Sequence, residues 1–475
     1  WLLLRGTLEP AACGVAALGV LMAAWWLTEA IPIPATSLLP LAALPLLSGG
    51  DIAIGTVARS YGHELIFLFM GGFMVALAME RWSLHRRIAL GTILLVGTKP
   101  RRVVLGFMVA SAGLSMWISN TATVVMMLPI ALSVIGLVRR ATGEGQAEPR
   151  DGRRRPFPFA VCLLLGTAYG ASLGGLATII GTPPNGLFAA FASESYGRDI
   201  TVSSWLPVGL SVTLVMLPVT WLVLTRVVFP VRLAEIPGGR ELIRAEVREL
   251  GPMSAAESRV LAVFLSLAAA WIGRGWLSGL ELGGGRPFGG LSDAGLAMTA
   301  ALLLFALPAG DGGRRLLSWS QAVKLPWGIL LLFGGGLSLA AAVRETGLDR
   351  VIGESVAGLE GVATPILVLA VTAIVVFLTE MTSNTATTAT FLPIMGAVAE
   401  GLGVEPLLLL IPMTLAASCA FMMPVATPPN AIVFGSGELT IAQMCRAGLW
   451  LNLLSLVVLQ AVVYGVAVPL FDLAP

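Results

Sequence analysis

Charged side chains are scarce in this 475-residue sequence: Asp, Glu, Lys and Arg make up 12% of it, against about a quarter in soluble globular domains. Hydrophobic residues make up 56%, and the mean hydropathy is +0.89. Apolar runs long enough to cross about 30 Å of hydrocarbon recur along the whole chain. The shortage of charge excludes a soluble globular protein and predicts an all-α polytopic membrane protein that lies in a lipid bilayer.

Cysteine, histidine and lysine are also rare. The four cysteines form no CxxC pair, so we expect small buried side chains and neither a disulfide framework nor a cysteine metal site. The two histidines form no HExxH motif, and the sequence shows no nucleophile–base pair, so an enzyme is not expected. Only 2 of the 29 basic residues are lysine, which is typical of a GC-rich bacterial gene. We therefore expect a multi-pass protein of the bacterial inner membrane, with no organic cofactor and no nucleic-acid partner.

The most informative feature that is present is an internal repeat. The motif Ser-Asn-Thr-Ala-Thr occupies 119–123 and again 383–387, and the motif Thr-Pro-Pro-Asn occupies 182–185 and again 427–430. The first pair is separated by 264 positions and the second by 245, so the first copy holds 19 additional residues between its motifs. The polar run 139–155 accounts for these residues and is expected to be a solvated cytoplasmic loop.

Each Ser-Asn-Thr motif lies between two apolar stretches that are short for a complete crossing. Residues 103–118 and 122–138 are about 16 residues each, and basic residues flank both outer ends. Two complete spans and a re-entrant hairpin with its tip near mid-membrane both agree with this pattern. A tip of three small polar residues without Gly or Pro suits helix ends that face a cavity better than a solvent turn. We therefore favour the hairpin.

The Thr-Pro-Pro-Asn motifs predict two helices that are unwound in the middle. Two successive prolines remove two backbone donors and prevent the helix from continuing. In the first repeat, the broken centre is expected to include Gly174-Gly175 and residues 181–185, between helices over 159–171 and 179–191. Each unwound helix is thus a partner for one hairpin tip.

Two further features lie close to the motifs or between them. Glu380 stands beside the second tip, where Met116 occupies the equivalent position of the first. Orientation of the tip, a response to protons and a structural hydrogen bond are all open to this carboxylate, and the hydrogen bond is the favoured interpretation. The run Gly334-Gly335-Gly336 lies in an apolar stretch, so we interpret it as close helix packing and not as a phosphate-binding loop.

The distribution of charge predicts that the two repeats have inverted topology. Following the crossings along the chain places 22 of the 29 Lys and Arg residues inside and 7 outside, and the second hairpin lacks the basic flanks of the first. Ten crossings and two opposed re-entrant hairpins fit this pattern. The predicted units are a first repeat (1–235: scaffold spans 11–97, hairpin 101–138, broken helix and crossing 156–230), a cytoplasmic linker (236–259) and a second repeat (260–475: scaffold spans 260–359, hairpin 363–398, broken helix and crossing 405–470).

The four motifs offer hydroxyls, amides, freed carbonyls and helix N-termini, but no Lys or Arg. Oxygen ligands suit an alkali cation, and hydroxyls with helix N-termini suit a carboxylate or another oxyanion. Such a cluster can also be interhelical glue, but two copies in register, each with a Pro-Pro break, favour a site. An anion there needs its charge balanced, so Na⁺ is the expected co-bound ion. The repeat register predicts two Na⁺ sites: Ser115, Ser119, Asn120 and Gly181, and Thr379, Ser383, Asn384 and Ala426.

The segments WISNTATVVMMLPI (117–130) and TEMTSNTATTATFLPI (379–394), with GTPPN (181–185) and ATPPN (426–430), resemble the divalent anion/Na⁺ symporter family of INDY-like dicarboxylate carriers. The resemblance implies a homodimer with a fixed scaffold and an elevator-type transport domain. It also implies Na⁺-coupled symport of C4-type dicarboxylates (the succinate, malate and fumarate class). A dicarboxylate exchanger and a carrier of sulfate or another divalent anion are the alternatives. The residues that it implies for substrate contact are Ser119, Asn120, Thr121, Thr182, Pro183, Ser383, Asn384, Thr385, Thr427 and Pro428.

Overall fold

The computed structural model describes residues 9–97, 99–142, 157–233, 235, 239–281, 285–310, 313–356, 358 and 361–474. Within these residues the regular structure is helical, with an isolated bridge between Pro308 and Arg315. Eight of the described helical segments are long and apolar enough to cross a membrane, by length and composition. The expected all-helical architecture is confirmed for the described residues, while the number of crossings stays a prediction.

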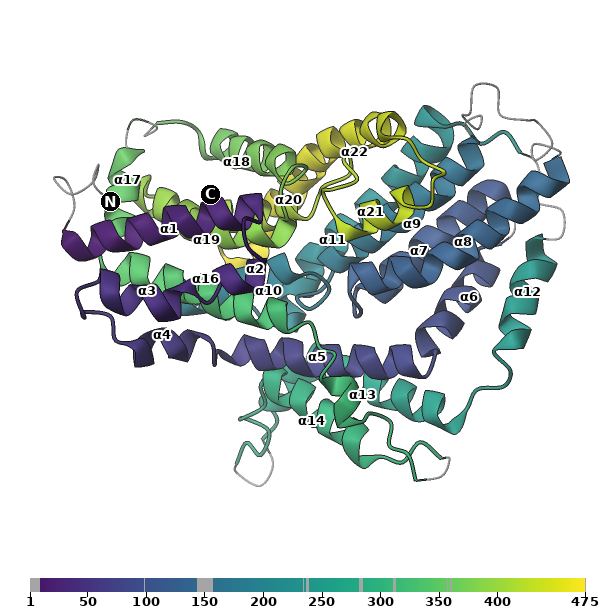
Figure 1. Cartoon of the computed structure of the whole chain (residues 1–475), viewed down its shortest axis with the longest axis horizontal. Helices are drawn as coiled ribbons and strands as arrows, with labels where there is room; N and C mark the ends of the chain where they lie inside the picture. Colours follow the sequence, from purple (N-terminus) through teal and green to yellow (C-terminus); the bar gives the residue numbers. More distant parts are fainter. Residues whose placement is uncertain are drawn as a thin grey trace.

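The helices form two series that follow the repeat (Figure 1). The first series is α1 (Pro10–Thr28), α2 (Ile33–Thr36), α3 (Leu39–Leu47), α4 (Ile54–Ser60), α5 (Glu64–Arg81), α6 (Leu84–Val96), α7 (Pro100–Ser115), α8 (Asn120–Thr142), α9 (Pro158–Leu176), α10 (Pro183–Tyr196) and α11 (Val202–Leu222) with its π-helical extension η2 (Val223–Val228). The linker contains α12 (Gly239–Glu249).

The second series begins after the linker. It is α13 (Ala255–Ser278), α14 (Asp293–Ala306), α15 (Trp319–Ala322), α16 (Trp327–Glu345), α17 (Leu348–Ser355), α18 (Thr364–Leu378), α19 (Asn384–Gly401), α20 (Leu407–Ala417), α21 (Pro428–Phe434) and α22 (Ile441–Val462), continued by η4 (Val463–Ala467) and α23 (Val468–Phe471). The first residues of α7 and α18 differ by 264, as do those of α8 and α19, and those of α10 and α21 differ by 245. The helices therefore begin in the register of the sequence repeat.

Several expected bounds differ from the observed ones. Helix α9 continues through Gly174 and Gly175 to Leu176, so the expectation that these glycines lie in the broken centre is wrong. Within 11–97, which is predicted to hold scaffold spans, the helices α2, α3 and α4 are short, with four, nine and seven residues. Of the loop expected at 139–155, residues 139–142 still belong to α8, and 143–155 lie outside the described residues.

Small residues let α9 approach α7 closely, and this explains why α9 stays helical through its glycines. A Cβ added at Gly170 would lie 2.7 Å from the Met108 carbonyl oxygen, and one added at Gly174 would lie 2.2 Å from that of Ala112. A spacing of four residues places both glycines on one face, as in small-xxx-small contacts between membrane helices. Packing against α7 thus compensates for the low intrinsic helix propensity of glycine.

Helices α9 and α20 form the centre of the molecule. Every residue of α20 is buried, and so is α9 from Phe159 to Leu176. Helices α7 and α8 pack on α9, and α18 and α19 pack on α20 (Figure 1). The short helices after the breaks are exchanged between the repeats, because α21 packs against α8 and α9 while α10 packs against α19 and α20. Each half of the centre is therefore built from both repeats.

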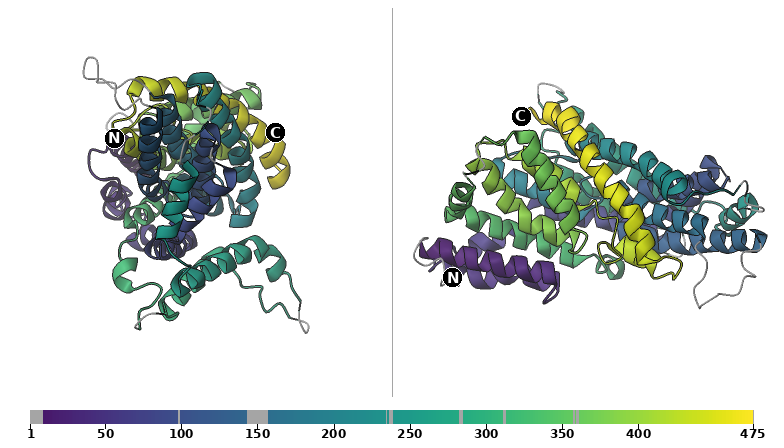
Figure 2. Two further views of the ribbon diagram at one scale, coloured as in Figure 1. Left: turned by 90° about the vertical axis from the view of Figure 1, so that its right-hand side faces the viewer. Right: turned by 90° about the horizontal axis from the view of Figure 1, so that it is seen from above.

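The remaining helices form an outer part around α5 and α16. Helix α5 packs against α14, and α16 packs against α2, α3 and α4. A Cβ added at Gly334 would meet the ring of Tyr61, and one added at Gly335 would meet the backbone of Ser37. These contacts confirm close packing as the interpretation of the glycine run. The left view of Figure 2 shows α13 and α14, in teal and green, as a layer below the other helices.

The linker is attached to α6 by ion pairs. Arg86 Nη2 lies 2.6 Å from Glu246 Oε2 of α12, and Arg87 Nε lies 3.0 Å from Glu257 Oε1 of α13. These contacts join the basic start of α6 to the beginning of the second series. The cytoplasmic position of the linker stays a prediction.

Candidate functional site

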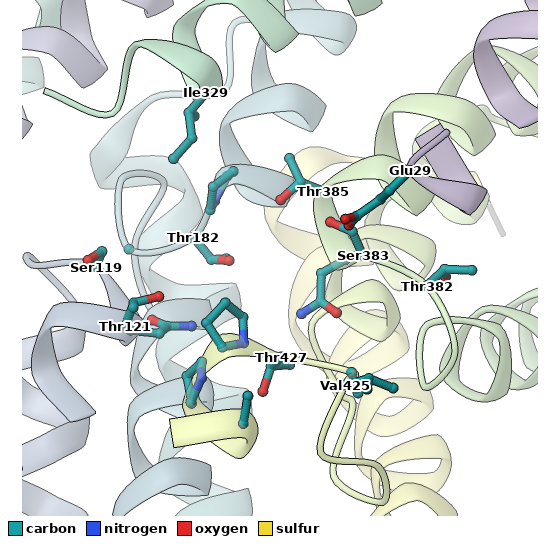
Figure 3. A pocket seen from close by; sticks show the side chains of 18 of the residues that line it. Glu29, Ser119, Thr121, Thr182, Ile329, Thr382, Ser383, Thr385, Val425 and Thr427 are labelled. Atoms are coloured by element: carbon teal, nitrogen blue, oxygen red, sulfur yellow. The ribbon is translucent and has the colours of Figure 1, made fainter. Parts of the chain in front are cut away.

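The two Ser-Asn-Thr tips and the two Thr-Pro-Pro-Asn segments meet at one pocket of about 750 Å³ (Figure 3). The tips lie where α7 meets α8 and where α18 meets α19, on opposite sides of the pocket (Figure 3). All ten residues expected to contact substrate line this pocket: Ser119, Asn120, Thr121, Thr182, Pro183, Ser383, Asn384, Thr385, Thr427 and Pro428. Their role in binding stays a prediction, but the repeat brings them to one place.

Four helices begin at the pocket wall, namely α8, α10, α19 and α21. The first turn of a helix has unpaired backbone N–H groups and the positive end of the helix dipole, both of which favour an anion. Part of this donor capacity is used locally, because Ser119 Oγ accepts from Ala122 N–H at 3.2 Å and Thr427 Oγ1 accepts from Asn430 N–H at 3.2 Å. The pocket thus combines positive helix ends with hydroxyls and amides.

The residues predicted for the first cation site lie together. The Ser115 hydroxyl donates to Asn120 Oδ1 at 2.5 Å, and Ser115 is buried behind the pocket wall while Asn120 lines it. A Cβ added at Gly181 would lie 3.0 Å from the Ser115 carbonyl oxygen and 2.5 Å from that of Gly175. A Cβ added at Gly175 would lie 2.5 Å from Asn120 Oδ1 and 3.1 Å from the Gly181 carbonyl oxygen. Several oxygen atoms therefore converge between the tip and the break, as a cation site requires.

The second predicted site repeats this arrangement. The Thr379 hydroxyl lies 2.8 Å from Asn384 Oδ1 and 2.8 Å from the Ala417 carbonyl oxygen, and its single hydrogen can be donated to either acceptor. Thr379 is buried, and Ser383, Asn384 and Ala426 line the pocket. In both repeats, then, a hydroxyl one turn before the tip holds the oxygen of the tip asparagine. The sequence register predicted this pairing, and Gly175 is the neighbour that it missed.

The asparagines of the Thr-Pro-Pro-Asn motifs brace the unwound backbone. The Asn185 amide donates to the Thr178 carbonyl at 2.8 Å and the Leu176 carbonyl at 3.1 Å. The Asn430 amide donates to the Met423 carbonyl at 3.0 Å, and Met423 is equivalent to Thr178 at the offset of 245. Carbonyls freed by the break are thereby satisfied by a side chain. The motif contains these asparagines but does not reveal their role, because their partners are backbone carbonyls of a loop whose conformation the sequence pattern does not specify.

Glu380 supports the second break. Its carboxylate accepts hydrogen bonds from the backbone N–H groups of Phe421, Met422 and Met423, at distances of 2.7 to 3.0 Å, and from Asn452 Nδ2 at 2.8 Å. The side chain is buried, with 4% of its surface exposed. The favoured interpretation of Glu380 as a hydrogen-bonding group is confirmed, although its partners lie 41 to 72 residues away in the chain.

The outer helices complete the wall of the pocket. The end of α1 contributes Leu27, Thr28 and Glu29, α5 contributes Phe73, and α16 contributes Ile329. Figure 3 shows the Glu29 carboxylate directed toward the side of the pocket that Ser383 and Thr385 form. The sequence alone does not identify these residues as pocket lining, because they lie outside the Ser-Asn-Thr and Thr-Pro-Pro-Asn motifs and approach the tips only through tertiary packing.

Three comparisons with known proteins show what this chain is similar to. The family model described as the sodium:sulfate symporter transmembrane region matches residues 4–471. The sodium-dependent dicarboxylate transporter SdcS of Staphylococcus saprophyticus is 42% identical over 461 residues, covering 97% of this chain and 87% of that protein. SdcS of Staphylococcus aureus is 43% identical over 454 residues, covering 95% of this chain and 85% of that protein. Among solved structures, the YdaH transporter of Alcanivorax borkumensis is similar in fold, with a TM-score of 0.58 and 16% identity over 97% of this chain and 100% of that chain.

Proposed function

The chain belongs to the divalent anion/Na⁺ symporter family, and we propose that it is a Na⁺-coupled symporter of C4-type dicarboxylates in the bacterial inner membrane. The relatives that are 42% and 43% identical are named sodium-dependent dicarboxylate transporters and are similar over almost the whole chain. The family description also names sodium together with an anion. A secondary carrier fits both names and the duplicated pocket better than an enzyme does.

The observation that carries this proposal is the composition of the pocket. Among the described residues that line it, hydroxyls and amides dominate the polar groups, and none is Lys, Arg or His. A dianion that leaves water here has no fixed cation as a partner, and burying unbalanced charge is costly. Co-bound Na⁺ supplies the missing positive charge, which couples the binding of the two solutes.

Each tip has a role in this proposal. Ser119, Asn120 and Thr121 with Thr182 and Pro183 bind one substrate carboxylate. Ser383, Asn384, Thr385, Thr427 and Pro428, their counterparts, bind the other. One Na⁺ is held by Ser115, Ser119, Asn120 and Gly181, and a second by Thr379, Ser383, Asn384 and Ala426. Support comes from the shared pocket and from the hydroxyl–asparagine bonds behind both tips.

The proposal extends to the architecture. We infer that α7–α8 and α18–α19 are re-entrant hairpins of two inverted repeats, since the sequence charges differ between their flanks. We further infer a homodimer in which α1–α5, α13, α14 and α16 form a fixed scaffold. The hairpins and broken helices then move together as an elevator-type transport domain, and alternating access follows from this motion.

Uptake of labelled succinate into proteoliposomes tests the function. We expect accumulation with an inward Na⁺ gradient, weak uptake with Li⁺, and none when choline replaces Na⁺. Uptake that is unchanged in choline, and that instead needs an internal dicarboxylate, would establish an exchanger. Because the family description names sulfate, sulfate is included as a competitor; stronger competition by sulfate than by malate or fumarate would reassign the substrate class.

A further inference from the structure

Asp293 joins the outer part of the molecule to the beginning of α11. Its Oδ2 accepts a hydrogen bond at 2.8 Å from the N–H group of Val202, the first residue of α11. Its Oδ1 lies 3.2 Å from Arg274 Nε, and Asp293 itself is buried. A carboxylate at the first turn of a helix suits the unpaired N–H groups and the positive end of the helix dipole. This contact therefore fixes α11 to α14, which begins at Asp293.

The other repeat has both parts of the equivalent contact but has not formed it. Glu29 is equivalent to Asp293 at the offset of 264. Ile441 is equivalent to Val202, because each is the first residue of its helix after a threonine that forms a capping box. Among the described residues, neither the Glu29 carboxylate nor the Ile441 N–H group has a hydrogen-bond or ion-pair partner, and both residues are exposed. Figure 1 shows the end of α1, which Glu29 caps, apart from the yellow-green beginning of α22.

The pocket is open beside one break and closed beside the other. Val425, two residues before the second Thr-Pro-Pro-Asn motif, is 75% exposed. Its counterpart at the offset of 245 is Ile180, which is 6% exposed although both residues line the pocket. Glu29 lines the open pocket, whereas its counterpart Asp293 belongs to a closed contact. Two inverted repeats in different conformations are what one state of an alternating-access carrier requires.

We propose that Asp293 and Glu29 are positioning residues that each stabilise one of two states of the carrier; this rests on the proposed function as a carrier with inverted repeats. Asp293 holds the beginning of α11 in the state described above. When the repeats exchange conformations, the contact of Asp293 opens and Glu29 binds the Ile441 N–H group at the beginning of α22. Because each contact exists in one state only, its loss shifts the equilibrium between the states. A hydrogen bond to a charged group is strong enough for a shift of about tenfold or more.

The labelling rate of Ile180→Cys measures the population of the opposite state. In a purified full chain whose four native cysteines are replaced by alanine, this side chain is buried in the present state and becomes accessible when the repeats exchange. Its rate of reaction with a maleimide in detergent then follows the population of the opposite state. Glu29→Ala should lower this rate about tenfold, and Asp293→Ala should raise it about tenfold or more.

Proline substitutions test the backbone donors. Proline has no N–H group but is well tolerated at the first residue of a helix. Ile441→Pro removes the donor assigned to Glu29, so it should lower the labelling of Ile180→Cys as much as Glu29→Ala does. The two substitutions together should have no further effect, because they remove the same contact. Val202→Pro should raise the rate as Asp293→Ala does.

Asp51→Ala is the control, because Asp51 is exposed and lies outside the pocket in the same outer part. It should leave the labelling rate unchanged. The elution volume in detergent shows whether each variant is folded. If Asp293→Ala does not fold, Glu29→Ala and Ile441→Pro decide the matter, since neither side of their contact has a partner to lose in the present state.

The proposal is overturned if Glu29→Ala leaves the labelling rate unchanged or raises it, since a general loosening of the structure raises the rate in every variant. It is also overturned if the effects of Glu29→Ala and Ile441→Pro add. The proposed function fails separately, if wild-type protein binds succinate equally well in Na⁺ and in choline, because the labelling rates need no substrate and can still be read in that case.

Discussion

The two repeats place the same motifs around the pocket but support them with different chemistry. In the first, the Thr178 hydroxyl donates to the Met116 carbonyl at 2.5 Å and accepts from Gly181 N–H at 3.0 Å. In the second, the position of Thr178 is taken by Met423, and the Glu380 carboxylate binds the backbone of the break instead. A neutral hydroxyl in the first repeat and a buried carboxylate in the second thus both hydrogen-bond the backbone of the break. The duplication has kept the geometry of the break but not the side chains that support it.

The repeats also differ in how tightly the break packs against the tip. In the first repeat, Gly175 and Gly181 leave no space for a Cβ. The equivalent positions of the second repeat are Ala420 and Ala426, both buried. The second repeat therefore accommodates side chains at the places where the first has only backbone.

The largest effect is expected where the repeats are alike. Asn120→Ala and Asn384→Ala each remove the oxygen that the hydroxyl of Ser115 or Thr379 holds in place. If both asparagines bind cation and substrate, each variant should lower Na⁺-driven succinate uptake by roughly a hundredfold while the protein still folds. Uptake into proteoliposomes and the elution volume in detergent measure the two properties. Normal uptake by one variant would mean that its tip is interhelical glue.

The next prediction concerns the buried carboxylate. Glu380→Gln replaces a negative acceptor by an amide whose NH₂ group faces the N–H donors of residues 421–423, so these bonds are weakened or lost. Hydrogen bonds to a charged group are worth about 1.5–3 kcal/mol each, and we expect a loss of stability of about 3 kcal/mol. The apparent melting temperature in detergent measures it.

Met116→Gln is the matched control at the equivalent position of the first repeat, where the bond from Thr178 goes to the backbone and survives the substitution. It should cost less than about 1 kcal/mol. Similar losses for Glu380→Gln and Met116→Gln would show that the carboxylate does not hold the second break.

These contacts mark the limit of what the sequence predicts. The tips, the Pro-Pro breaks and the pairing of Ser115 with Thr379 follow from spacing alone, because the repeat fixes equivalent positions without knowledge of the fold. The partners of Glu380 do not follow from spacing, since they depend on how the end of α18 packs against the loop at 421–423, about 40 residues away. Gly174 and Gly175 were misassigned to the break because local propensity gives no information on α7, whose packing keeps α9 helical. Glu29 has an acidic counterpart at the offset of 264, Asp293, but the match of Thr28-Glu29-Ala30 with Ser292-Asp293-Ala294 is too short to indicate a place in the pocket wall.

A smaller effect should distinguish the packing of the two breaks. In Gly181→Ala the new methyl group would lie 2.5 Å from the Gly175 carbonyl oxygen, so the backbone has to shift. Overpacking of this kind costs about 1–3 kcal/mol, and we expect a corresponding rise in the Na⁺ concentration for half-maximal uptake. The converse change, Ala426→Gly, creates no clash and should cost no more than about 1 kcal/mol. Equal changes in Na⁺ dependence would contradict the difference in packing.

The last difference concerns two ion pairs that link the repeats, one with its arginine in the first hairpin and the other with its glutamate after the second. Arg139, at the end of α8, forms a two-point pair with Glu438 between α21 and α22, with Nη1 at 2.7 Å from Oε1. In the other half, the acidic residue is Glu405, which follows α19, and its partner Arg198 follows α10. The distance from Arg198 Nη2 to Glu405 Oε1 is 3.6 Å. The side chains of Arg139 and Glu438 are 17% and 12% exposed, and those of Arg198 and Glu405 are 47% and 28% exposed.

Burial and geometry therefore predict unequal contributions from the two arginines. Arg139→Gln should cost about 1.5–3 kcal/mol, because a two-point hydrogen bond between a guanidinium and a carboxylate in a largely shielded place is strong. Arg198→Gln should cost at most about 0.5 kcal/mol, and 1 M salt should abolish this effect by screening the exposed charges. Melting temperatures in detergent at low and high salt measure both. If the two variants lose the same stability, or if high salt also abolishes the effect of Arg139→Gln, the links are equivalent surface pairs and the repeats do not differ at this contact.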